Sequence, residues 1–162
     1  MDQNGRVLSL DAMLSDLEYL VSVESPSHDI EAITRSAGAV RDVIKRRLGR
    51  DAELVHGDAG PHVHARFGAA SRVLLVGHHD TVFPIGALAA RPFAVNNGRA
   101  TGPGVFDMKA GVAVAMSVLA ALVKGPRPPA VSLLLVPDEE ALERGVERVF
   151  TDVVGECVKD ER

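Results

Sequence analysis

Apolar residues recur at helical spacing in two segments near the start of the chain. Leucines three or four residues apart predict a helix over Leu10–Ser22 that buries one stripe and is capped by Ser9. A longer helix is predicted over residues 29–48, with Ser27 as its cap and Gly49 at its end. The first of these helices is expected to serve packing.

Several short runs further along have the composition of strands. Residues 53–56 and 62–67 predict a hairpin, residues 73–76 form an apolar run suited to a sheet buried on both sides, and Val131–Val136 predicts another buried strand. Between the last two runs, residues 107–124 predict a helix that is apolar all round and therefore lies in the interior against the sheet. This strand-helix-strand order predicts an α/β layer fold with active residues at the strand ends.

The composition is that of a globular protein, and it narrows the classes of function. The chain has 162 residues, of which 46% are hydrophobic and 25% charged, so one ordered domain is expected. A net charge of −4 and the lack of a basic stripe argue against nucleic acid as a partner. No leader pattern and no apolar stretch of membrane-spanning length is recognised, so the expectation is no membrane partner and a cytoplasmic location. A single cysteine excludes an intrachain disulfide.

Three segments carry histidine and acidic side chains where metal chemistry would need them. The stretch VGHHDTVFP ends an apolar strand with His78 and Asp80, which share a strand face at i and i+2. The imidazole can then ligate a metal while the carboxylate orients it. The stretch TGPGVFDMKAG places Asp107 at a helix start, and LLLVPDEE ends a strand with three consecutive acids. Together, the three segments predict a metal site.

In these motifs the chain resembles a family of zinc-dependent peptidases and deacylases. The family includes glutamate carboxypeptidase, acetylornithine deacetylase, succinyl-diaminopimelate desuccinylase and aminoacylase, and the glutamate carboxypeptidase-like members look most similar. The resemblance implies two zinc ions. It also implies five roles: His78 ligates one zinc, Asp80 steadies that histidine, Asp107 bridges both ions, Glu139 is the general base and Glu140 ligates the other zinc.

Elementary chemistry agrees with these implied roles. Two nearby divalent ions need a shared carboxylate to offset their repulsion, which suits Asp107. Adjacent acids diverge in direction, so Glu140 can bind metal while Glu139 stays free to move a proton. Asp138 is then expected to be structural or to support the ligands. Imidazole and carboxylate ligands suit zinc, but also cobalt or manganese.

The resemblance covers about the first 140 residues, and the remainder departs from the family pattern. Residues 1–140 are expected to form the amino-terminal part of the catalytic domain, followed by a divergent tail over residues 141–162. Family members continue with a further acidic ligand, a lid or dimerisation domain and a late zinc-binding histidine, whereas all six histidines here lie in the first half of the chain. The expected fold is therefore a truncated three-layer α/β sheet with flanking helices and no lid domain, and the expected site is incomplete.

A glycine-rich turn and a second histidine pair have alternative interpretations. The GPG turn at residues 102–104 can cradle an anion or simply position Asp107, and the acid favours the second interpretation. His62 and His64 also share a strand face, a spacing that can bind metal. Because residues 63, 65 and 67 would form the buried face, both histidines are expected to be exposed.

Two residues beside the candidate ligands are expected to have ordinary roles. His79 should point away from His78 across the strand and pack or form a hydrogen bond. Lys109 is expected to stay exposed or to pair with a nearby acid.

Two functions from different classes remain. The first is a metal-dependent hydrolase of amide bonds in peptides or N-acyl amino acids, as the resemblance implies, although this chain by itself is expected to be inactive. The second is a non-catalytic fragment or binding module with at most a partial metal site. In either case an unpaired sheet edge is expected, which predicts self-association.

Overall fold

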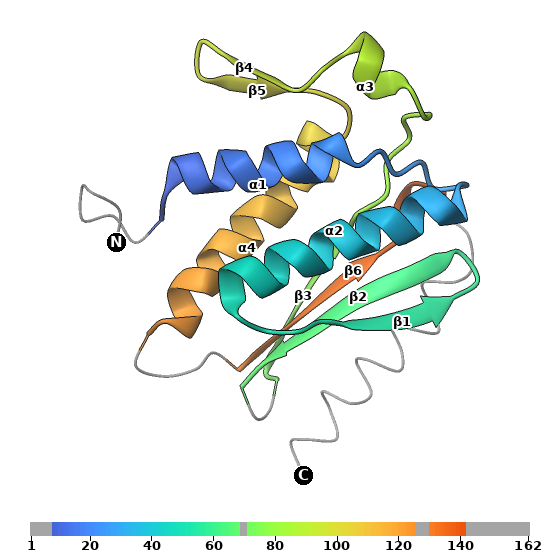
Figure 1. The fold of residues 1–162 in the computed structure, drawn as a ribbon. Helices are drawn as coiled ribbons and strands as arrows, with labels where there is room; N and C mark the ends of the chain where they lie inside the picture. The colour runs from blue at the N-terminus through green and yellow to red at the C-terminus, as the bar shows by residue number, and fades with distance from the viewer. Residues whose placement is uncertain (1–7, 69–70, 126–129, 142–162) are drawn as a thin grey trace.

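The computed structural model describes residues 8–68, 71–125 and 130–141 (Figure 1). Four strands form a sheet in the order β1-β2-β6-β3, and β4 and β5 form a separate hairpin. In chain order the elements are α1 (Leu10–Ser22), α2 (Ile30–Leu48), β1 (Glu53–Gly57), β2 (Gly60–Phe67), β3 (Val73–His78), α3 (Ala87–Ala90), β4 (Ala94–Asn96), β5 (Arg99–Thr101), the π-helical turn η1 (Val105–Lys109), α4 (Ala110–Val123), β6 (Val131–Val136) and the 3-10 turn η2 (Glu139–Ala141).

The pairing of β3 with β6 determines where chemistry can occur. Strand β6 is antiparallel to β2 but parallel to β3, with His78 opposite Val136 at the end of the pair. A parallel pair needs a crossover, which here runs through α3, the β4–β5 hairpin and α4. Both strands therefore end at the same edge of the sheet, and the segments that follow them become neighbours.

The two long helices begin and end at residues suited to those positions. Ser9 caps α1 as predicted, and its Oγ accepts a hydrogen bond from the Ala12 amide at 3.3 Å. The predicted Ser27 cap for α2 is wrong, because Asp29 is the residue directly before the first helical turn and accepts from the Ala32 amide at 2.9 Å. Gly49 ends α2 as predicted, in the left-handed conformation with φ 62°.

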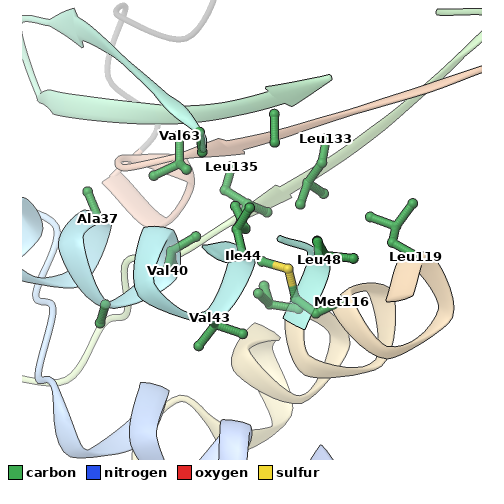
Figure 2. Packing of buried hydrophobic residues seen from close by; sticks show 14 of the residues in the cluster. Ala37, Val40, Val43, Ile44, Leu48, Val63, Met116, Leu119, Leu133 and Leu135 are labelled. Carbon is green, nitrogen blue, oxygen red and sulfur yellow. The ribbon is translucent and has the colours of Figure 1, made fainter. Parts of the chain in front are cut away.

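The main core lies between the sheet and the helices α2 and α4, with α1 packed across both helices (Figure 1). Alternate residues of β2 and β6 point toward the helices, as expected for a pleated sheet. Figure 2 shows the side chains that meet there, which include Val63, Leu133 and Leu135 from the sheet, Ala37, Val40, Val43, Ile44 and Leu48 from α2, and Met116 and Leu119 from α4.

The mixed α/β fold is confirmed, but the described part of the chain has fewer layers than expected. Helices α1, α2 and α4 all lie on one face of the sheet (Figure 1). The opposite face carries the buried side chains of Leu134 and Val136, with Val55 and Leu74 packed beside them. Among the described residues no helix covers that face, so the predicted third layer is not seen there, and residues 142–162 of the predicted tail lie outside the described residues. The boundary at residue 140 stays a prediction.

Strand β3 is less buried than its composition predicts. Val73 is 50% exposed and Val76 47% exposed, so the prediction of burial on both sides is wrong for this strand. The reason is its place in the sheet, since β3 pairs only with β6 within the described residues and forms an edge there. The hairpin of β1 and β2 is confirmed, with a shorter connection than expected.

Helix α4 is also only partly interior. Val112, Ala113, Met116 and Leu119 are buried, whereas Val114, Val118 and Leu122 are exposed on the outer side. The expectation of burial all round is therefore wrong, because a helix on the surface of a sheet buries one side only.

The stretch Val105–Val123 does reach membrane-spanning length and apolarity by composition, contrary to the expectation from the sequence. Its regular helical part is shorter, however. Asp107 and Met108 have non-helical backbone angles, and α4 itself has 14 residues, about 21 Å at 1.5 Å per residue. That length falls short of a bilayer core of about 30 Å, and one side of the helix packs in the core of this fold.

Candidate metal centre

The candidate ligands come from three segments that the fold brings to one edge of the sheet. His78 is the last residue of β3, and Asp80 follows two residues later. Glu139 and Glu140 are the first two residues of η2, just beyond the end of β6. Asp107 lies in η1, the turn that leads into α4. The parallel pairing of β3 and β6 is the reason that the first two groups meet.

His78, Asp107 and Glu140 each offer a ligand atom, and these atoms all lie within 4.8 Å of one another. His78 Nε2 is 3.1 Å from Asp107 Oδ1 and 3.9 Å from Glu139 Oε2. His78 is buried, Glu140 is half-buried and the Asp107 side chain is 66% exposed. One wall of the site is therefore fixed in the protein interior, and the other is open to solvent.

Asp80 connects the two strand ends beneath these ligands. Its Oδ1 lies 3.2 Å from His78 Nδ1, so the imidazole presents Nε2 toward the acids. Its Oδ2 accepts a hydrogen bond from Ser27 Oγ at 2.6 Å and one from the Glu140 amide at 3.2 Å. The side chain is fully buried, and its hydrogen bonds fix the orientation of His78 and the backbone of Glu140 together.

Glycines allow the turn that carries Asp107 to approach β3 closely. Gly104 has φ 69°, and a Cβ there would lie 2.5 Å from Thr81 Cγ2. Met108 packs over Gly77, and its Sδ accepts a hydrogen bond from the His78 amide at 3.3 Å. The Asp107–Met108 peptide bond is cis. These contacts fit the interpretation of the GPG turn as a device that positions Asp107.

The electrostatics of the site favour a cation. Burial by itself would lower the pKa of His78, but hydrogen bonds with Asp80 and Asp107, together with the charges of Asp80 and Glu139, raise this pKa to about 9. Burial also raises the pKa of Glu140, and the neighbouring carboxylates Asp107, Glu139 and Asp80 add to this increase. A positive charge at His78 Nε2 would relieve this concentration of acids, and a metal ion there would do the same.

The donor set fits zinc. One imidazole nitrogen and two carboxylates, with a further carboxylate behind the histidine, are ligands that zinc accepts in proteins. Cobalt and manganese accept the same types of ligand.

His79 behaves as predicted. It is buried beside His78, and its ring nitrogens lie 3.2 Å from Ser36 Oγ and from the Pro61 carbonyl oxygen. Burial lowers its pKa to about 4, so the ring is neutral at physiological pH. The predicted packing and hydrogen-bonding role is confirmed.

Lys109 does not behave as predicted. It is 3% exposed, and its Nζ donates to the carbonyl oxygens of Leu20 and Val23. The first alternative, an exposed lysine, is wrong, because the turn η1 directs this side chain beneath α1. The second, pairing with a nearby acid, is met only in part: the charges of Glu24 and Asp80 act on the ammonium, while its hydrogen bonds go to carbonyl oxygens. Ser27 was likewise not recognised as a partner of Asp80. The sequence holds no local signal for either contact, since the partners lie more than 50 residues away in each case.

The second histidine pair is buried in β2, which is separated from β3, the strand of His78, by β6. His62 is 0% exposed and His64 4% exposed, so the expectation that both face solvent is wrong. Val63, Ala65 and Phe67 do form the face toward the helices. The histidines face the opposite side of β2, where apolar residues of β1 and β6 also lie. Asp138 is buried too, and its structural role stays a prediction.

The described residues thus form an α/β sheet with a group of histidine and carboxylate side chains, able to hold a metal ion, at the ends of two parallel strands. The chain belongs to peptidase family M20/M25/M40, whose family model matches residues 74–161. This range contains the five candidate site residues.

Two curated proteins resemble the chain in sequence. Carboxypeptidase G2 of Pseudomonas sp. (strain RS-16) is 36% identical over 115 residues, which cover 67% of this chain and 27% of that protein. Succinyl-diaminopimelate desuccinylase of Gluconobacter oxydans (strain 621H) is 40% identical over 84 residues, which cover 49% of this chain and 22% of that protein. The chain thus spans about a quarter of the length of the curated relatives that it matches.

Solved structures share the fold. The M20 family metallo-carboxypeptidase Sso-CP2 from Sulfolobus solfataricus has a TM-score of 0.67 at 20% identity, over 97% of this chain and 36% of that one. The di-peptidase Dug1p from Saccharomyces cerevisiae has a TM-score of 0.72 at 15% identity, over 91% of this chain and 36% of that one. The arrangement of strands and helices described above is therefore that of one part of larger proteins.

Proposed function

We propose that this chain carries part of the catalytic domain of a metal-dependent amide hydrolase that acts on small peptides or N-acyl amino acids. The observation that carries the proposal is the convergence of His78, Asp107 and Glu140 within 4.8 Å, with Asp80 behind the histidine. Membership of the M20/M25/M40 family and similarity to a carboxypeptidase and a desuccinylase support it. From the resemblance to glutamate carboxypeptidase-like proteins, we propose that the substrate has a free α-carboxylate on the amino acid whose amide bond is cleaved.

In this proposal each residue has a separate task. His78, Asp107 and Glu140 hold the metal, and Asp80 keeps His78 Nε2 directed at it. When bound, the metal supplies Lewis acidity toward an amide carbonyl. Glu139 moves protons, as the family resemblance implies, and its carboxylate is 57% exposed and lies 3.9 Å from His78 Nε2. Zinc is the proposed metal, with two ions by resemblance. A cytoplasmic location stays a prediction from the sequence.

A second candidate function is metal binding without turnover. The described residues contain one group of three ligands, which is enough for one ion but short of the two that the resemblance implies. A chain that held one ion in this way would bind metal or a ligand of the metal, and would hydrolyse nothing by itself.

Metal stoichiometry of the full chain tests both functions. The purified monodisperse chain is loaded with zinc, dialysed and measured by elemental analysis beside Asp107→Ala and the control Asp51→Ala, which changes an exposed carboxylate far from the site in the sequence. Hydrolysis of N-acyl amino acids and of peptides ending in glutamate is then compared for the original chain and Glu139→Gln.

Each outcome favours one function or neither. Two zinc ions that are lost in Asp107→Ala, with turnover that Glu139→Gln abolishes, would support the hydrolase. One zinc ion without turnover would support the second candidate. No zinc retained by the original chain would overturn both proposals.

A further inference from the structure

Lys109 is a buried charge that the proposed chemistry leaves unexplained. The residue is 3% exposed, and its ammonium lies 2.9 Å from the Leu20 carbonyl oxygen and 2.7 Å from the Val23 carbonyl oxygen. Both carbonyls belong to the end of α1, where the helix leaves acceptors without partners inside the helix. Lys109 therefore caps the carboxyl end of α1 from a distant part of the chain, where a cation is also favoured by the helix dipole.

The charges of two acidic side chains, Glu24 and Asp80, offset part of the cost of burying the Lys109 ammonium. Glu24 acts on the ammonium through its negative charge, and the Glu24 carboxylate accepts hydrogen bonds from the Gly86 and Leu88 amides. Burying an ammonium without such partners would be costly, so the cluster fixes a single position for the side chain. The end of α1, the α3 segment and η1 are held together at this point.

The same residue holds the turn that carries Asp107. The Lys109 amide donates to the Gly104 carbonyl oxygen at 3.0 Å, and the side-chain carbons Cδ and Cε lie 3.6 Å from where a Cβ on Gly104 would be. Main chain and side chain of Lys109 thus both restrain residues 104–109. Asp107 lies two residues earlier and is mostly exposed. Among the described residues, the one hydrogen-bond partner of its side chain is His78, whose Nε2 lies 3.1 Å from Asp107 Oδ1. Its position consequently depends on the backbone of the turn.

We propose that Lys109 is a positioning residue for Asp107. By tying η1 to the end of α1, it keeps the Asp107 carboxylate within reach of His78 Nε2 before any metal is present, so that binding does not have to order the turn. This inference rests on the proposed function, because it assigns Asp107 the role of a ligand. A preorganised ligand is bound more tightly than one that must first be ordered.

The test separates positioning from general stabilisation of the fold. Lys109→Met keeps an unbranched side chain that is shorter by one atom, and it removes the side-chain donors. Leu119→Ala is the matched control for stability, since Leu119 is 1% exposed in the core at the other end of α4. Lys124→Met is the control for losing an exposed lysine. All are made in the full chain and compared at a temperature where each is folded.

Two readouts are used, one of which needs no metal. Amide hydrogen exchange in the metal-free chain is expected to be at least about tenfold faster across residues 104–109 in Lys109→Met, but unchanged there in Leu119→Ala. Cobalt affinity is expected to fall at least about tenfold in Lys109→Met, with an altered visible spectrum as the Asp107 carboxylate is displaced, and to stay within about twofold in both controls. Lys109→Gln, which keeps a neutral amide as a donor group, should give intermediate values and serves if the methionine variant does not fold.

The outcomes for Lys109 and for the proposed function can be told apart. Unchanged exchange across residues 104–109 in the Lys109 variants would overturn the positioning role, whatever the metal does. Faster exchange with unchanged cobalt affinity would also overturn it, because the turn would then not matter for the ligand. If the original chain binds neither cobalt nor zinc, the proposed function is wrong. Faster exchange in the Lys109 variants would then show only that Lys109 holds the turn, and its role in positioning a metal ligand would be overturned with the proposed function.

Discussion

Two pairs of side chains at i and i+2 lie in the same sheet and have opposite surroundings. His62 and His64 lie in the middle of β2, on a face shared with Leu134 and Val136. His78 and Asp80 lie at and beyond the end of β3, next to Asp107 and the η2 acids. His62 lies beside the apolar side chain of Val55, and His64 lies between Leu134 and Glu53. The second pair, in contrast, is surrounded by three carboxylates.

The difference shows that spacing alone does not make a metal site. An i, i+2 pair inside a strand is surrounded by the neighbouring strands and whatever covers the sheet face. An i, i+2 pair at the end of a parallel strand meets the residues that follow the next strand, which are not constrained by a ladder of hydrogen bonds. The residues beyond the strand ends, rather than the histidines themselves, separate the two regions.

The largest expected effect is the difference in zinc affinity between two variants, His78→Leu and His62→Leu, which replace the first residue of each pair. His78→Leu should weaken zinc binding by at least about a hundredfold, because it removes the single imidazole of the group. His62→Leu should leave the zinc affinity of the folded chain unchanged. Competition with a chromophoric chelator measures both affinities. Equal losses in the two variants would mean that the His62 pair also takes part in binding.

Asp80→Asn should weaken zinc binding by about 10-fold to 100-fold. The asparagine side chain keeps the shape of aspartate but loses the negative charge that supports His78. Only one of its two terminal atoms is an oxygen, so it cannot accept all the hydrogen bonds from Ser27, His78 and the Glu140 amide. Asp16→Asn is the matched control, since Asp16 is also buried but pairs with Arg46 and Arg47 between α1 and α2. The control is expected to lower the midpoint of thermal unfolding without changing the zinc affinity, and a similar loss of affinity in both variants would refute the role of Asp80.

Two buried histidines, one in each region, are expected to affect the pH dependence of the free energy of unfolding. Burial lowers the pKa of His62 below 6.5, so the unfolded chain takes up a proton more readily than the folded chain. This contribution to stability is complete above pH 6.5 and is lost as the pH falls below that value. His79 adds a loss of the same sign between pH 6.5 and about 4.

His62→Leu should therefore reduce, but not abolish, the decrease in the free energy of unfolding between pH 7 and pH 5. Urea titrations of the metal-free chain at each pH measure it. His28→Leu, which changes an exposed histidine, is the control. The same pH dependence in His62→Leu and the original chain would mean that His62 is hydrated in the folded state.

The smallest expected effect is that of Ser27→Ala. It removes one hydrogen bond of 2.6 Å to Asp80 but leaves the bonds with His78 and Glu140, so a loss of about 1 kcal/mol in the free energy of unfolding is expected. Zinc affinity should fall by less than in Asp80→Asn. Ser22→Ala, whose hydroxyl bonds the Tyr19 carbonyl at the surface, is the control. An effect as large as that of Asp80→Asn would show that Ser27 has a further role.

Local patterns predicted the long helices and the strands of the main sheet, and the family resemblance indicated the residues that meet at the site. Neither predicted how deeply these residues are buried. The leucine spacing of α1, the left-handed Gly49 and the apolar run of β6 are features of neighbouring residues, and they could be predicted. The exposure of β3 and α4 depends on which strands and helices lie beside them. For the same reason the burial of His62 and Lys109 could not be predicted, since their surroundings come from distant segments.

The hydrogen bond from the Glu140 amide to Asp80 has a consequence for the order in which the fold can assemble. It joins the two ends of the long crossover between β3 and β6, so it forms only after that whole loop has closed. A metal held by His78 and Glu140 would cross-link the two ends of the same loop, as a disulfide does. It would bind the native chain but not the unfolded one. Metal is thus expected to slow opening of the crossover rather than to speed its formation.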